Sequence, residues 1–98
     1  MNRLEHLLVI LGEECSELHQ ESCKALRFGV HEQRDQPTSN LDRMTYEYSQ
    51  LVAMLHMLQE EGVNVRLDYN IVAEKKAKVE KYLAYSHECG TLTGEGNE

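Results

Sequence analysis

The fold is decided by residues 41–61, which read LDRMTYEYSQLVAMLHMLQEE. At about 100° per residue, a helix over this stretch places Leu51, Met54 and Leu58 within about 40° of Glu47. The helix therefore has an apolar stripe with a carboxylate inside it. Because an ionised carboxylate is costly to bury without a partner, Glu47 requires a cation or a hydrogen-bond donor nearby.

A second stretch with helical periodicity runs from residue 3 to residue 27, and Gly29 follows it as a helix stop. Its acids Glu13, Glu14 and Glu17 occupy a sector beside the apolar stripe, with Glu14 nearest the apolar edge. Acids that face Glu47 across a helix interface are tolerable only with a metal ion between them. The apolar stripe recurs at spacings of three and four and consists of Leu4, Leu7, Leu8, Leu11, Cys15, Leu18, Ala25 and Leu26.

The rest of the chain predicts an all-α protein built as a bundle of about three main helices. Residues 30–40 contain the only proline and no apolar period, and are predicted to form a loop. A third helix is expected from residue 68 or 70 to residue 86. We predict one all-α domain over residues 1–89 and a disordered tail over residues 90–98, which contain three glycines.

The two long helices expose more apolar surface than a third can cover, which predicts self-association as a dimer or tetramer. A compact monomeric three-helix bundle is the alternative. The net charge of −7 argues against a nucleic-acid duplex as partner, because phosphate contacts need clustered lysine and arginine. We found no apolar run that could span a membrane and no signal peptide, so a cytoplasmic protein without a membrane partner is expected.

The three cysteines have no paired Cys-x-x-Cys spacing and imply neither a disulfide framework nor a zinc site. Cys15 and Cys23 fall at helical positions that predict small core residues. Redox chemistry is therefore not expected of them.

The acids of the two long helices form a candidate magnesium site. Mg²⁺ prefers hard oxygen ligands and usually keeps positions for waters and phosphate oxygens. Residues three or four apart on a helix are neighbours, so Glu14 with Glu17, or Glu13 with Glu17, can hold one ion. Glu47 and Gln50, also three apart, can approach the same ion from the facing helix.

Two alternatives to the metal site stay open. The pattern Glu-Glu-x-x-Glu by itself is also typical of a solvated helix face. Glu47 can instead be a buried acid whose partner is Arg27, Arg43 or a tyrosine hydroxyl. Its place inside an apolar stripe is what favours the metal interpretation.

The acidic motifs resemble those of a known family. The segments EECSE at 13–17 and KALRFG at 24–29 resemble the first helix of MazG-like all-α nucleoside triphosphate pyrophosphohydrolases, whose signature is Glu-Glu-x-x-Glu, a loop, then Glu-x-x-Asp. The segment EYSQLVAML at 47–55 resembles the Glu-x-x-Asp helix. The resemblance covers residues 3–86 and is closest to small stand-alone members common in bacteriophage genomes. The phrases Asn40-Leu41-x-Arg43 and Glu60-Glu61-Gly62 fit the same pattern.

The resemblance implies hydrolysis of a nucleoside or deoxynucleoside triphosphate to monophosphate and pyrophosphate, in the host cytoplasm if the chain is phage-encoded. It implies Mg²⁺ as the cofactor, with Glu13 orienting or deprotonating the attacking water. The implied metal ligands are Glu14, Glu17, Glu47 and Gln50.

Basic residues are the candidates for binding the substrate. Family members often reach phosphates with basic residues of a later helix, which points to Lys75 and Lys78. Arg27, at the end of the first helix, is a third candidate. The alternatives are a solvated basic face for the lysines and neutralisation of the helix C-terminus for Arg27.

The sequence departs from the family pattern at Gln50, where the family has aspartate. A glutamine offers one carbonyl oxygen without a charge, so metal affinity should fall. Two functions remain: an enzyme that is weaker or uses Mn²⁺, and a catalytically inactive relative that binds nucleotide or a protein partner.

Overall fold

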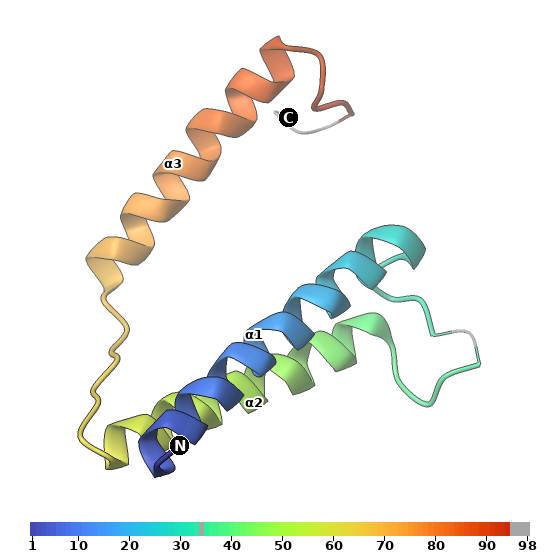
Figure 1. Cartoon of the computed structure of the whole chain (residues 1–98). Helices are drawn as coiled ribbons and strands as arrows, with labels where there is room; N and C mark the ends of the chain where they lie inside the picture. Colours follow the sequence, from blue (N-terminus) through green and yellow to red (C-terminus); the bar gives the residue numbers. More distant parts are fainter. Residues whose placement is uncertain (34, 95–98) are drawn as a thin grey trace. The chain divides into compact units, whose positions relative to one another are not determined.

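The computed structural model describes residues 1–33 and 35–94, which form three α-helices and no strand (Figure 1). The helices are α1 (Arg3–Phe28), α2 (Asn40–Glu60) and α3 (Tyr69–Glu88). The all-α class and the three main helices are therefore confirmed. The helix bounds lie within two residues of the predicted ones.

The first two helices begin at capping boxes. The Asn2 side chain accepts a hydrogen bond from the Glu5 amide at 2.8 Å, and the Glu5 carboxylate accepts one from the Asn2 amide at 3.0 Å. Ser39 and Asp42 form the same reciprocal pair at the start of α2. Each box satisfies two amides that the helix itself leaves without a partner. At the other end of α1, Gly29 ends the helix with a φ of 107°, which glycine adopts readily because it has no Cβ.

Helices α1 and α2 pack side by side as an antiparallel hairpin (Figure 1). An ion pair between Arg3 and Glu61 joins the start of α1 to the end of α2. A second ion pair, Glu21–Arg43 at 3.4 Å, joins the helices nearer the loop. The residue numbers of both ion pairs add up to 64. The register is therefore constant along the hairpin, and residues whose numbers add up to 64 lie at the same level.

The apolar core of the hairpin is small and lies away from the loop. Leu7 of α1 packs with Met54 and Leu58 of α2, and all three are buried. This cluster therefore occupies the part of the helix interface near the start of α1, whereas Ala25 is the buried apolar residue of α1 nearer the loop. Partly buried neighbours complete the cluster: Leu4, Leu11, Met57 and Val63.

Part of the predicted apolar stripe does not face this core. Leu8, Leu26, Cys15 and Cys23 are exposed in the structure, so the hairpin by itself does not bury these predicted core residues. The physical reason is that a single facing helix covers a narrower sector than the stripe of about 100° expected for a bundle helix.

The loop end of the hairpin is closed by backbone and side-chain hydrogen bonds around Asn40, which is almost fully buried. Its side-chain amide donates to the Gly29 carbonyl at 2.7 Å, and its backbone amide donates to the Glu32 carbonyl at 3.1 Å. The Leu41 amide donates to the Val30 carbonyl at 2.8 Å. The end of α1 and the start of α2 are thereby held together independently of the loop tip.

The chain divides into two compact units, Met1–Val65, which contains the hairpin, and a second unit that starts at Arg66 and contains α3. The Asp68 side chain caps α3 by accepting hydrogen bonds from its first amides. After α3, the Thr91 and Leu92 amides bond to the Ser86 carbonyl. Of the predicted disordered tail, positions 95–98 lie outside the described residues. The single domain stays a prediction.

No helix in residues 1–33 or 35–94 combines the length and the hydropathy that a membrane crossing requires.

Candidate metal centre

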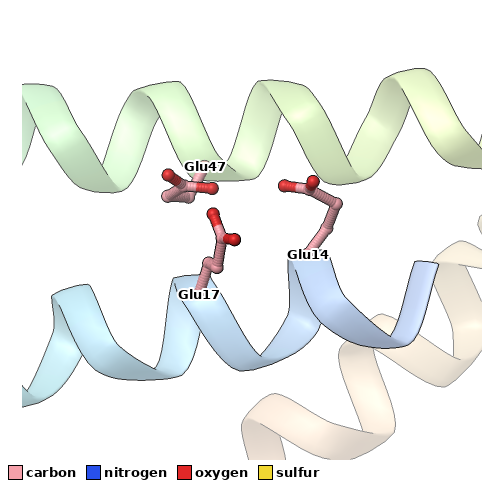
Figure 2. Close-up of side chains that lie close together, drawn as sticks. All are labelled: Glu14, Glu17 and Glu47. Carbon is pink, nitrogen blue, oxygen red and sulfur yellow. The ribbon is translucent and has the colours of Figure 1, made fainter. Parts of the chain in front are cut away.

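Three carboxylates converge between the two helices of the hairpin (Figure 2). Glu14 and Glu17 come from α1, and Glu47 comes from α2. One oxygen of each lies within 4.8 Å of the other two. Glu14 and Glu47 are half-buried and Glu17 is exposed, so the group lies at the edge of the helix interface with one side open to solvent. We call these three residues the carboxylate triad.

The helix geometry explains the convergence. Glu14 and Glu17 are three residues apart and therefore lie on the same face of α1, about one turn from each other. Glu47 lies at the level of Glu17, because their numbers add up to 64 like those of the ion pairs. The apolar core lies on one side of this level and the loop on the other, so the triad takes the middle of the hairpin.

The surroundings of Glu47, the member of the triad on α2, favour its protonated form. The pKa of Glu47 is raised from its usual 4.5 to about 7. Burial is the largest cause, because it disfavours the charged form, followed by the hydrogen bond and the negative charge of Glu17 and then by Glu14. Glu14 Oε2 and Glu47 Oε2 are both buried and accept no hydrogen bond.

The alternative partners for Glu47 are engaged elsewhere. Arg43 pairs with Glu21, and the Arg27 guanidinium lies 4.9 Å above the ring of Phe28. Among the described residues, no cation forms an ion pair with Glu47 and no tyrosine hydroxyl donates to it. Neither a cation nor a tyrosine hydroxyl of the described residues therefore accounts for the placement of this acid.

The donor set of the triad fits a hard divalent cation. Three carboxylate oxygens lie within reach of one ion, and two of the carboxylates each have a buried oxygen without a donor. Mg²⁺ takes such oxygens as ligands and accepts waters or phosphate oxygens at its remaining positions. A cation bound there would offset the mutual repulsion that contributes to the raised pKa of Glu47.

The other two predicted acid-site residues lie beside the triad. Gln50 is exposed, one turn after Glu47 on α2, and at the level of Glu14 by the register of the hairpin. Glu13 is exposed and precedes Glu14, outside the triad. Both are thus open to solvent on the helices that carry the carboxylates.

The basic candidates fall into two places. Arg27 ends α1 and lines a cavity at the loop end of the hairpin. Lys75 and Lys78 are exposed on α3 and line a separate cavity of about 240 Å³ with Val79 and Tyr82. That cavity belongs to the second unit.

The polar cluster between the triad and the loop was not predicted from the sequence, in which Arg43 was only an alternative partner for Glu47. Glu21 contacts Lys24 and Arg43, each at 3.4 Å, and Asn40 lies beside them. The available signal was the spacing: Lys24 lies about two turns after Glu17 on α1, and Arg43 lies about one turn before Glu47 on α2. In an antiparallel hairpin these positions meet.

No protein-family model matches the chain, and neither a curated protein nor a solved structure matches it. The geometry of the triad and the resemblance of its motifs are the observations that bear on function.

Proposed function

We propose that this chain is a MazG-like nucleoside triphosphate pyrophosphohydrolase that uses Mg²⁺, or Mn²⁺, to release pyrophosphate from nucleoside or deoxynucleoside triphosphates. The observation that carries the proposal is the carboxylate triad: three acids within 4.8 Å across a helix interface, without a cationic partner among the described residues. Such an arrangement costs stability unless a cation binds to it. A cytoplasmic location is part of the proposal, because the substrate pool is cytoplasmic.

The triad would hold the cation, and Gln50 would add a carbonyl oxygen from the level of Glu14. When bound, Mg²⁺ neutralises negative charge on the phosphates of the substrate. Glu13 is placed on the solvent side of the same turn of α1, where a carboxylate can accept a proton from the attacking water. Arg27 is the proposed contact to phosphate oxygens from the hairpin, and a phosphate contact by Lys75 and Lys78 stays a prediction from the resemblance.

The bond changes of the reaction are those of a simple hydrolysis. The water oxygen bonds to the α-phosphorus while the bond from that phosphorus to the oxygen bridging to the β-phosphate breaks. Pyrophosphate leaves with the electron pair of the broken bond. The proton from water passes to Glu13 and then to solvent.

The direct test is pyrophosphate release from a panel of ribo- and deoxynucleoside triphosphates with Mg²⁺ or Mn²⁺, for the natural chain and for Gln50→Asp. We expect turnover by the natural chain, and about tenfold tighter metal binding by Gln50→Asp because a charged ligand replaces a neutral one. Colorimetric detection of pyrophosphate and calorimetric titration of the metal provide the two measurements.

A second function is favoured by Gln50 alone, which lacks the charge of the family aspartate. In that case the chain binds nucleotide or a protein partner without turnover. Absence of turnover by the natural chain, together with turnover by Gln50→Asp, would contradict the enzyme proposal and support this second function.

We also propose that the chain self-associates as a dimer or tetramer. A two-helix hairpin whose buried apolar residues are Leu7, Ala25, Met54 and Leu58 buries too little apolar surface to be stable alone. Large apolar side chains on the same two helices are exposed and available to a second copy: Leu8, Val9, Leu26, Tyr46 and Tyr48.

Self-association predicts that the melting temperature depends on protein concentration. Each tenfold increase in concentration is expected to raise it by roughly 5 °C, because only the folded state assembles. Circular dichroism melts over a hundredfold range of concentration, with sedimentation equilibrium at both ends, provide the measurement. A monomer with a constant melting temperature would contradict the proposal.

A further inference from the structure

A cavity of about 570 Å³ lies at the loop end of the hairpin, beyond the carboxylate triad. Its lining includes three cationic side chains, Lys24 and Arg27 from α1 and Arg43 from α2, against one carboxylate, Glu32. Phe28 adds an aromatic ring. Glu21 pairs with Lys24 and Arg43, so three cations face two carboxylates here. In a chain with a net charge of −7, the remaining positive charge favours an anionic ligand.

Arg43 is held in place at this cavity by hydrogen bonds to the backbone and to neighbouring side chains. Its guanidinium donates to the Thr38 carbonyl at 2.6 Å and to the Asn40 side-chain oxygen, and its Nε lies 3.4 Å from Glu21 Oε2. Asn40 is itself fixed by its bond to the Gly29 carbonyl. Arg43 therefore supplies a positive charge of fixed position, while most of its donors are already in use.

Arg27 differs from Arg43 because none of the described residues accepts a hydrogen bond from its guanidinium N–H groups. Its guanidinium lies 4.9 Å above the Phe28 ring, which orients the group, and within the described part of the chain it makes no ion pair or hydrogen bond. A guanidinium held by a ring can present its N–H groups in pairs to a phosphate. Lys24, 3.4 Å from Glu21, places a third cation on the same side of the helix pair.

The cavity and the triad lie in line along the hairpin. Lys24 follows Glu17 by seven residues on α1, about 10 Å along the helix axis, and Arg43 precedes Glu47 by four residues on α2, about 6 Å. Glu21, bound to both cations, separates the acids from the cavity. For a triphosphate to contact both sites, the long side chains of Lys24 and Arg27 have to extend along α1 toward the triad.

We infer that this cavity binds a pyrophosphate group, the β- and γ-phosphates of the nucleoside triphosphate, through Lys24, Arg27 and Arg43. This inference rests on the proposed function for the identity of the whole ligand, but the pyrophosphate pocket itself stands on the cations and the cavity. It places the leaving group toward the loop and the α-phosphate at the triad. The nucleoside then lies on the side of the triad away from the loop.

Binding of inorganic pyrophosphate to the full chain without divalent cations tests the pocket separately from the metal site. By isothermal titration calorimetry, Arg27→Gln is expected to weaken pyrophosphate binding about tenfold, because it removes a charged donor to phosphate. Lys81→Gln is the matched control: it removes one positive charge that also lies over a ring, that of Tyr82 at 5.9 Å, but on α3. That variant is expected to leave binding unchanged, and circular dichroism checks that both variants stay helical.

The results of these measurements distinguish failure of the pyrophosphate pocket from failure of the proposed function. If pyrophosphate binding depends on Arg27 while neither Mg²⁺ nor Mn²⁺ binds the triad, the pocket stands and the enzyme proposal fails. If the metal binds and the chain turns over but pyrophosphate binding is absent, or falls equally in both variants, the pocket inference is overturned. It is also overturned if a nucleoside without phosphates, rather than pyrophosphate, shifts the NMR signals of the Phe28 ring and the Asn40 side-chain amide.

Discussion

Replacing Glu47 with glutamine is expected to abolish divalent-cation binding and to lower pyrophosphate release at least about a hundredfold. Glu47 is the only member of the carboxylate triad that α2 contributes, so its loss leaves two acids on a single helix. Calorimetric titration with Mg²⁺ and Mn²⁺ and the pyrophosphate assay measure the two effects. The matched control is Glu60→Gln, an exposed acid on the same helix with the same change of charge.

The stability of a Glu47 variant distinguishes a metal ligand from a structural acid. Glu47→Leu is expected to abolish metal binding while raising the melting temperature of the metal-free chain, because it removes a clustered charge from the helix interface. Loss of both folding and metal binding would show that Glu47 supports the fold, and the metal interpretation would then be wrong. Equal loss of turnover in Glu60→Gln would show a general charge effect.

The metal-free chain is expected to lose stability as the pH rises from about 5 to 8. The pKa of Glu47 is about 7 in the folded chain and 4.5 when the residue is solvated, so between these values the folded state holds a proton that the unfolded state has released. The free energy of unfolding therefore falls with rising pH through this window, and the contribution of Glu47 is fully present below pH 4.5 and lost above pH 7. Allowing for partial exposure, the change is on the order of 1–2 kcal/mol.

Urea unfolding followed by circular dichroism at pH 5, 6.5 and 8 measures this dependence, with Glu47→Gln as the reference that lacks the titrating group. Mg²⁺ is expected to stabilise the chain more at pH 8 than at pH 5, because a metal and a proton compete for the same carboxylates. If Glu47→Gln shows the same pH dependence as the natural chain, other groups cause it. Stabilisation by Mg²⁺ that does not change with pH would place the ion away from the triad.

The sequence was sufficient for the parts of the structure that depend on local periodicity. The spacing of apolar residues predicts the three helices, and the position of Glu47 in an apolar stripe predicts that it meets acids of the first helix. The structure brings Glu14, Glu17 and Glu47 together as that argument requires. Whether a metal binds them stays a prediction.

The exposure of individual apolar residues and the pairing of polar ones depend on the register of the two helices and on how much of α1 is covered by α2. The spacing of apolar residues determines neither. The apolar periodicity predicts which side of α1 is apolar, but Leu8 and Leu26 lie at one edge of that stripe and α2 leaves them exposed. The pairing of Glu21 with Arg43 follows from the exact length and closure of the loop. For that reason the cationic cavity was not predicted, although its three cations lie in motifs that the resemblance includes.

The closure around Asn40 has a consequence for the tolerance of the hairpin to insertions. Because bonds from Asn40 and Leu41 reach back to Gly29 and Val30, the register is set before the chain reaches the tip of the loop. Extra residues inserted between Gln36 and Pro37 therefore lengthen the loop without changing the register of the two helices. Variation in length can accumulate at this point while the spacing of acids and cations along the helix pair is kept, which makes the tip a suitable place for a tag or a reporter.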